Sequence, residues 1–413
     1  MPASAAARHT PAIDLNRATQ IQHIEYSRDV VHRHSKAIPK LFNLILSYIE
    51  DVEKKVRATG QKALWAGSPW AIPLIYANGY IPVQYSEVGR ISGQEAITVA
   101  ENYFQMPAET CSMVKATIGE LFLRRDNGIN RLFSLSNACE PFNQAWEVLK
   151  SEGYEIYIGD VVYRAPGVDG ERYDQVLAYF LKEIRSFNGW LTGDEKINEK
   201  HLTRELERRN RLMGKIGTVM DLRLKHPFYV RSLAVMYLMN GLNTYLGKPE
   251  EYEEMLDLLL EELLALGDEP EDQDKVIPLV WSGGNGQEFG VYEAIDEANG
   301  ALLGFVTVPY TKKYDLSIDP VESLARFQLD SMMAGASVYI RDAIEQQIAH
   351  VNARGLILYG YLGCSFGSVA REMYRDYFHQ KGIPSINIEG TFQVGPPTGQ
   401  IITRIRAFIE MFS

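Results

Sequence analysis

Short apolar segments alternate with amphipathic segments in two separate parts of the chain, and this alternation constrains the fold more than any other feature. It runs through residues 61–170 and again through residues 275–413. Strands that alternate with helices form parallel sheets covered by helices. The sequence therefore predicts an α/β fold with two Rossmann-like parallel-sheet domains. The predicted strands are 63–66, 80–85, 131–136 and 155–158 in the first part, and 276–281, 302–306, 356–361 and 385–388 in the second.

Two further segments show apolar residues at helical spacing without intervening strands. The first is 16–58, and the second is 171–267, which leads into an acidic linker at 267–274. In the second segment the amphipathic stretches are 173–187, 199–213, 227–246 and 250–266. The 413-residue chain is therefore divided into an N-terminal tail with helices (1–60), a first α/β domain (61–170), a helical insert (171–267) and a second α/β domain (275–413).

Composition and charge exclude several classes of protein. The formal net charge of −11 argues against a nucleic-acid partner, which would need a basic footprint. No apolar run reaches the roughly 18 residues of a membrane-spanning helix. Residues 1–8 lack the apolar core of a secretory signal and are expected to form a loose tail. Three cysteines without an export signal fit a reducing compartment, so we expect a cytoplasmic protein.

Each of the three cysteines directly precedes a predicted helix. Cys139 and Cys364 also follow predicted strands, at the edge of a parallel sheet where ligands bind, whereas Cys111 starts a helix only. A helix N-terminus carries free N–H groups and partial positive charge, which is expected to lower the pKa of a thiol. Three such thiolates can hold three irons of a [4Fe-4S] cluster and leave the fourth iron open. The simpler alternative is that the cysteines pack as small apolar side chains.

Two glycine-rich loops follow predicted strands. The loop from Ser282 to Gly286 can cradle a phosphate, or it is a plain tight turn, because it lacks both the dinucleotide fingerprint and the P-loop lysine. The loop around Cys364 is rich in glycine and serine, so that backbone N–H groups can approach cluster sulfurs.

Other residues permit other chemistry near Cys364. A cysteine nucleophile would need a histidine partner, and His350 and His379 are the two nearest in sequence. Glu389 follows the last predicted strand and is either an acid–base group or a helper to the next helix. Arg404 and Arg406 are expected to lie at the surface or in ion pairs.

Several segments, taken together and in order, resemble the 2-hydroxyacyl-CoA dehydratase and benzoyl-CoA reductase family, from about residue 60 to the end. Cys111 to Gly119 is similar to the family's first cysteine motif, Cys-x-x-Val-Lys/Arg-x-x-x-Gly. The other segments are Gly67-Ser68 with Pro73 to Val83, Ser136 to Cys139 with Trp146, Gly355 to Cys364, and Gly382 to Glu410. Pro309 to Lys312 resembles the larger of the two homologous subunits in the reductase branch.

The chain departs from the family's pattern at two places. The acidic residue that the family carries two positions after Glu389 is Thr391 here. The Asp-Pro-Arg that often follows is replaced by Gly395 to Thr398. These differences bear on the substrate and on the chemistry, whereas all three cysteines are present.

The resemblance implies a catalytic subunit in which Cys111, Cys139 and Cys364 hold one [4Fe-4S] cluster. It also implies a heterodimer with a homologous second subunit, and a separate ATP-hydrolysing iron–sulfur activator that supplies one low-potential electron. In a dehydratase this electron makes a ketyl radical from the acyl-CoA thioester, and the α-hydroxyl, bound at the open iron, leaves with a β-hydrogen. Ser68 and Glu389 are the catalytic candidates, the first as a hydrogen-bonding group toward the thioester or hydroxyl and the second as an acid–base group.

Three functional hypotheses follow. The first is a subunit of a radical 2-hydroxyacyl-CoA dehydratase. The second is a subunit of an aromatic acyl-CoA reductase, which the segment through Lys312 supports. The third is an electron-transfer iron–sulfur partner without a substrate of its own, which Thr391 keeps open. Product analysis separates the first two, and binding of acyl-CoA at an open iron separates both from the third.

Overall fold

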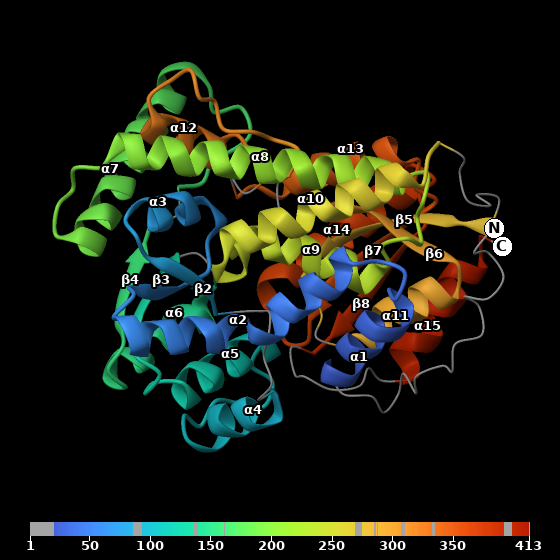
Figure 1. Ribbon diagram of the computed structural model, residues 1–413, viewed down its shortest axis with the longest axis horizontal. Helices are drawn as coiled ribbons and strands as arrows, with labels where there is room; N and C mark the ends of the chain where they lie inside the picture. Colours follow the sequence, from blue (N-terminus) through green and yellow to red (C-terminus); the bar gives the residue numbers. More distant parts are fainter. Residues whose placement is uncertain are drawn as a thin grey trace.

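The chain folds around two parallel sheets, each with four strands in the part that is described. A computed structural model describes residues 20–85, 93–135, 139–160, 162–268, 275–284, 286, 288–306, 310–332, 335–391 and 399–412. The first sheet has the strand order β2-β1-β3-β4 and the second β6-β5-β7-β8 (Figure 1). The predicted α/β fold with two parallel sheets is therefore confirmed. The strands are β1 (Ala63–Ala66), β2 (Ile81–Gln84), β3 (Arg131–Leu135), β4 (Glu155–Gly159), β5 (Ile277–Gly283), β6 (Gly300–Val306), β7 (Gly355–Tyr361) and β8 (Ser385–Gly390).

The two sheets repeat one topology. In each, the first strand in the chain pairs in parallel with the second on one side and with the third on the other. The chain therefore reverses its direction of winding beside β1 and again beside β5, and such switch points bind ligands at the carboxyl ends of the strands. The ends of β1 and β5 also resemble each other, since a buried tryptophan, Trp65 or Trp281, precedes a turn of small residues in both.

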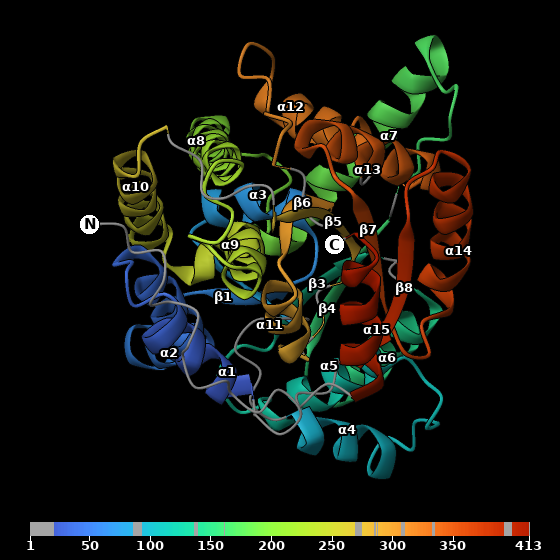
Figure 2. The same ribbon diagram turned by 90° about the vertical axis from the view of Figure 1, so that its right-hand side faces the viewer.

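Helices cover both faces of each sheet. Figure 1 shows α3 on one face of the first sheet and α5 and α6 on the other. Figure 2 shows α14 on one side of β7 and β8 and α15 on the other. The helices of the first half are η3 (Pro69–Ala71), α3 (Ile72–Ala77), α4 (Gly93–Asn102), α5 (Ser112–Leu123), α6 (Glu140–Ser151) and α7 (Gly170–Thr192). Those of the second are α11 (Gly290–Glu297), α12 (Pro320–Leu329), α13 (Ser337–Val351), α14 (Ser365–Gln380) and α15 (Gly399–Glu410).

The central helices join the two halves. These are α8 (Glu199–Arg223), α9 (Ser232–Thr244), η4 (Tyr245–Gly247) and α10 (Pro249–Ala265). Helix α9 contacts both β2 and β6. The buried Arg223 donates to the carbonyls of Val230 (3.0 Å) and Leu302 (2.9 Å), and burial lowers its pKa to about 10. This layer therefore contacts both sheets. The four segment boundaries given above stay a prediction.

The N-terminal segment, predicted to be helical over 16–58, contains a break between its helices. It consists of α1 (Gln20–Tyr26), the π-helix η2 (Ser27–Val31) and α2 (Ala37–Thr59). Glu262 in α10 explains the break, because its carboxylate accepts hydrogen bonds from the backbone N–H groups of Lys36 (2.6 Å) and Ala37 (3.2 Å). These N–H groups at the start of α2 have no partner within the helix, so a distant residue fixes where the helix starts. The tail expected at 1–8 and most of the linker expected at 267–274 lie outside the described residues.

The stretch predicted as a helix over 227–246 forms a helix only from Ser232. Asp296 in α11 accepts hydrogen bonds from the backbone N–H of Ser232 (3.1 Å) and from its hydroxyl (2.6 Å). A carboxylate at a helix start stabilises it through these bonds and through the helix dipole. None of the helices in the described ranges has both the length and the apolar character that crossing a membrane requires.

Candidate metal centre

Each cysteine is the residue immediately before a helix, as predicted. Cys111 precedes α5, Cys139 precedes α6 and Cys364 precedes α14. The last two occupy equivalent positions, because β3 leads to Cys139 and β7 leads to Cys364, and both are the third strand of their sheet. The repeated topology therefore places one cysteine on each sheet at the edge where ligands bind.

The loops that carry Cys111 and Cys364 touch each other. The backbone N–H of Ser112 donates to the carbonyl of Leu362 at 3.1 Å. Gly363 has a φ of +79°, and a Cβ at this position would lie 2.5 Å from the carbonyl oxygen of Glu109. Only a glycine satisfies both the backbone angle and the close approach. The thiols of Cys111 and Cys364 are hydrogen-bonded, so a cysteine of the first half meets one of the second.

Cys139 is influenced by one member of this pair, Cys364. Burial is the largest cause that raises the pKa of its thiol, and the charge of Cys364 raises it further. A hydrogen bond from the backbone N–H of Phe142, in the first turn of α6, acts in the opposite direction. Cys364 thus interacts with both of the other cysteines.

The expectation that the helix starts lower the thiol pKa is wrong for the protein without metal. The pKa of Cys111 is raised, first by its hydrogen bond to Cys364 and then by burial. Backbone N–H groups of Val114 and Met113 do lower it, as a helix start should, but their effect is smaller. The contact between two thiols from distant parts of the chain outweighs the local effect of the helix.

By its chemistry, a set of three thiols is suited to an iron–sulfur cluster with one open iron. Within the described ranges, no group of three or more histidine, cysteine, aspartate or glutamate side chains is arranged to hold a metal ion. In a cubane each thiolate binds its own iron. Cys364 interacts with both Cys111 and Cys139, and backbone N–H groups in the first turns of α5 and α6 are hydrogen-bonded to those two thiols.

A comparison with protein families finds a match over most of the chain. Residues 70–412 match the family described as 2-hydroxyglutaryl-CoA dehydratase, D-component. The match covers most of the chain, including all three cysteines and every strand except β1.

The chain belongs to this family.

The predicted resemblance to the 2-hydroxyacyl-CoA dehydratases is therefore confirmed, and the chain is a component of such a dehydratase. A comparison with curated proteins gives no match. The family match ends near the end of α15, so both halves of the repeated topology belong to the dehydratase component.

Ser68 lies just before the stretch that matches the dehydratase family. It follows β1 and precedes η3, and its side chain is buried. Since β1 pairs with β3, Ser68 lies at the same edge of the sheet as Cys139. Its role as a hydrogen-bonding group toward the substrate stays a prediction.

Glu389 lies within β8 rather than after it, and its side chain is half exposed. Its carboxylate accepts a hydrogen bond from Arg371 in α14 at 2.8 Å. Residues alternate between the two faces of a strand, so Glu389 faces α14 whereas Gly390 faces the opposite side. A Cβ at Gly390 would meet Glu288 and Tyr359, which confirms that direction. The ion pair with Arg371 gives Glu389 a structural role. Its role as an acid–base group stays a prediction.

Neither of the two histidines considered as partners of Cys364 is placed to act with it. His350 is hydrogen-bonded to Asp221 in α8 at 3.0 Å. His379 lies in the last turn of α14, roughly 22 Å along the helix from Cys364 at 1.5 Å per residue. The arrangement therefore does not favour a cysteine hydrolase. Arg406 pairs with Glu297 and Arg404 donates to the carbonyl of Asn387, as expected for surface arginines.

The loop after β5 is a tight turn rather than an open cradle. Gly283 has a φ of +112°, and a Cβ there would lie 2.0 Å from the carbonyl oxygen of Tyr359. The indole N–H of Trp281 donates to the carbonyl of Gly284 at 3.0 Å. Asn285 lies outside the described residues. The contacts within the described part favour the plain turn over a phosphate site.

Glu288 is a residue of this region that the sequence interpretation missed. Its side chain is buried, and burial raises its pKa to about 7. Its Oε2 accepts hydrogen bonds from the hydroxyl of Tyr359 (3.3 Å) and from the backbone N–H of Thr391 (3.2 Å). In the sequence, Glu288 could have been noticed only by its position between a predicted strand and a helix. Many surface carboxylates share that position, so it does not single out Glu288.

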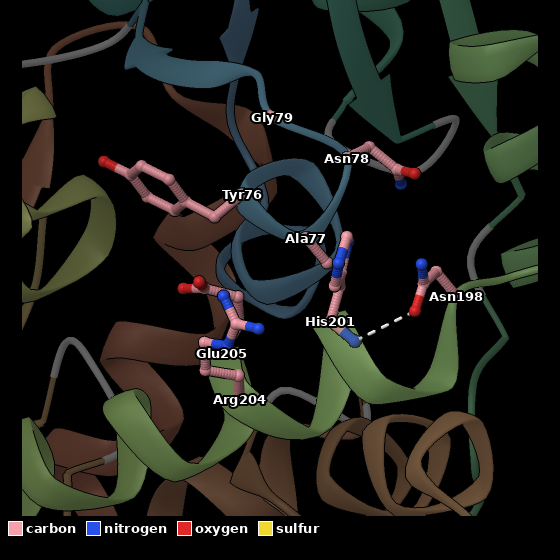
Figure 3. Close-up of a pocket in the computed structure, with 8 residues that line it drawn as sticks. All are labelled: Tyr76, Ala77, Asn78, Gly79, Asn198, His201, Arg204 and Glu205. Atoms are coloured by element: carbon pink, nitrogen blue, oxygen red, sulfur yellow. Dashed lines mark hydrogen bonds between the residues drawn. The ribbon is translucent and has the colours of Figure 1, made fainter.

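A cavity of about 490 Å³ lies away from the cysteines (Figure 3). It is formed by the end of α3 and the start of α8, where the backbone N–H of His201 donates to Asn198 at 3.1 Å. Its lining residues are Tyr76, Ala77, Asn78, Gly79, Asn198, His201, Arg204 and Glu205. Because α3 and α8 lie outside the loops that carry the thiols, this cavity is separate from the candidate metal centre.

Proposed function

We propose that this chain is the iron–sulfur catalytic subunit of an ATP-activated radical 2-hydroxyacyl-CoA dehydratase. The observation that carries the proposal is the contact between Cys111 and Cys364, with Cys139 coupled to them, in a chain of the dehydratase family. The three thiolates would each hold one iron of a [4Fe-4S] cluster. When bound, the cluster would supply one electron to the acyl-CoA thioester and an open iron for the α-hydroxyl.

The protein's own residues hold this centre. The backbone N–H groups of Val114 and Phe142 donate to the sulfurs of Cys111 and Cys139, and such bonds stabilise negative charge on cluster ligands. Gly363 allows the two cysteine loops to meet without a side chain between them. The central helices contact both sheets and so hold the two halves together.

The proposal includes two protein partners, a homologous second subunit and an ATP-hydrolysing iron–sulfur activator. Support comes from the family's description as one lettered component of a dehydratase. The sequence also contains neither a P-loop nor a second set of cysteines, so the chain has no means of coupling ATP hydrolysis to electron transfer by itself. The resemblance of Pro309 to Lys312 to a reductase subunit makes an aromatic acyl-CoA reductase the alternative.

We expect turnover only when the chain is combined with its second subunit, the activator and ATP. The experiment measures release of enoyl-CoA from 2-hydroxyacyl-CoA thioesters under anaerobic conditions, with each component left out in turn. Aromatic acyl-CoA thioesters are tested in parallel, and their reduction without dehydration would assign the reductase alternative. Sustained turnover by the lone chain without ATP would contradict the proposal and favour a hydratase in which the iron only polarises a hydroxyl.

A further inference from the structure

Glu288 lies at the carboxyl edge of the second sheet, where three strands bring their ends together. It follows β5, and its partners come from β7 and from the residue after β8. Two glycines make room for the group. A Cβ at Gly390 would lie 2.2 Å from Oε2 of Glu288, and a Cβ at Gly286 would lie 2.2 Å from the hydroxyl oxygen of Tyr359. Glycine at these two positions therefore leaves the space that the carboxyl of Glu288 and the hydroxyl of Tyr359 occupy.

Thr391 connects the β5 loop with the end of β8. Both its backbone N–H and its hydroxyl are hydrogen-bonded to Glu288. Glu288 therefore brings a carboxyl group from the β5 loop to the residue that follows β8. Thr391 is half-buried, whereas Glu288 is buried.

A short path of backbone hydrogen bonds leads from this pair to the cysteines. Gly390, next to Thr391, accepts from the N–H of Leu362 at 2.8 Å. Leu362 accepts in turn from the N–H of Ser112, the residue after Cys111. Leu362 also lies two residues before Cys364. Glu288 and Thr391 are therefore next to the loops that meet at the candidate metal centre.

The groups facing Glu288 are hydroxyls and aromatic rings. Tyr359 donates to it from β7, and Tyr359 itself interacts with Tyr292 of α11 and Tyr361 of β7. Tyr359 also stacks on Trp281 of β5 at 5.0 Å between ring centroids. A carboxyl in such surroundings holds its proton more tightly than one in water, and its proton affinity then suits acid–base work near neutral pH.

We propose that Glu288 and Thr391 form a proton relay that serves the acyl-CoA substrate, an inference that rests on the proposed dehydratase function. The hydroxyl of Thr391 takes the proton lost from the β-carbon and passes its own proton to the carboxylate of Glu288. In the reverse transfer, Glu288 returns a proton through Thr391 to the departing hydroxide, which leaves as water. Over the cycle the relay gains and loses one proton, and it needs no further oxidant or reductant. Thr391 is the catalytic residue of this pair and Glu288 the positioned proton store.

Substitutions of both residues test the relay in the assembled enzyme with second subunit, activator and ATP. E288Q should lower turnover by roughly a hundredfold or more, the range of general acid–base catalysis, while iron content stays at the wild-type level. The inflection near pH 7 in the wild-type rate profile should disappear. T391V should lower turnover and T391S should restore it, because serine keeps the hydroxyl. The matched control is E297Q, at the exposed far end of α11.

A second readout uses the metal-free chain alone. Infrared difference spectra across pH 7 should show a band of protonated carboxyl in the wild type that is weaker in E288Q, while the buried carboxyls of Asp296 and Glu293, whose pKa is also raised, account for the band that remains. If the wild type and E288Q give the same band, or if E288Q turns over with an unchanged rate and pH profile, the relay is wrong. If the wild-type assembly with all components shows no dehydration at all, the proposed function fails, and the relay for that reaction fails with it.

Discussion

Cys364→Ala should abolish both the iron–sulfur cluster and acyl-CoA turnover. Cys364 is in contact with Cys111 and raises the pKa of Cys139, so it is the one thiol that interacts with both others. Its loss leaves two thiols, too few to hold a cubane with one open iron. After anaerobic reconstitution, the iron content should fall from roughly four atoms per chain to near zero. Iron and acid-labile sulfide are the quantities to measure.

The same loss is expected for Cys111→Ala and Cys139→Ala. Val369→Ala is the matched control, because Val369 lies on α14 as well but is 68% exposed, and it should keep the wild-type iron content. Cysteines that merely pack would give variants with the full iron content of the wild type. Such a result for any one of the three would remove that cysteine from the ligand set.

Gly363→Ala should weaken the cluster without removing any ligand. The new Cβ would lie 2.5 Å from the carbonyl oxygen of Glu109 and 3.1 Å from the backbone nitrogen of Cys111, so the two cysteine loops must separate. Displacement of a site by about 1 Å can cost roughly a hundredfold in rate, and we expect a loss of that size. The iron content after a desalting step should also fall severalfold.

Gly382→Ala separates this effect from backbone strain. Gly382 has a φ of +75°, close to the +79° of Gly363, but nothing lies within 4 Å of a Cβ built there. Both variants therefore share the cost of a left-handed conformation, and only Gly363→Ala adds the collision. Equal iron content and equal activity in the two variants would show that the contact between the cysteine loops does not matter for the cluster.

The sequence predicted the fold well wherever the local pattern decides it. Strand β1 has the bounds that its pattern indicated. The three cysteines were correctly placed before helices, because strand, loop and helix signals lie within a few residues of each. Both sheets followed from alternation alone, since periodicity is a local property.

The features that the sequence did not predict depend on contacts between distant residues. The start of α2 is fixed by Glu262, which is 226 positions from Lys36. The pKa of Cys111 rises because Cys364 approaches it from the other half of the chain. Glu288 is recognisable as a buried carboxyl only once Thr391, 103 positions away, is seen to donate to it. No local pattern contains these pairings.

The most direct test of the cluster assignment is an anaerobic crystal structure with anomalous data at the iron edge. We expect one cubane of iron and sulfide where the two cysteine loops meet. The three Sγ atoms of Cys111, Cys139 and Cys364 should lie within about 7 Å of one another, as metal–sulfur bond lengths require. Iron absent from this place, or the three sulfurs separated by more than about twice that distance in a closed structure, would contradict it.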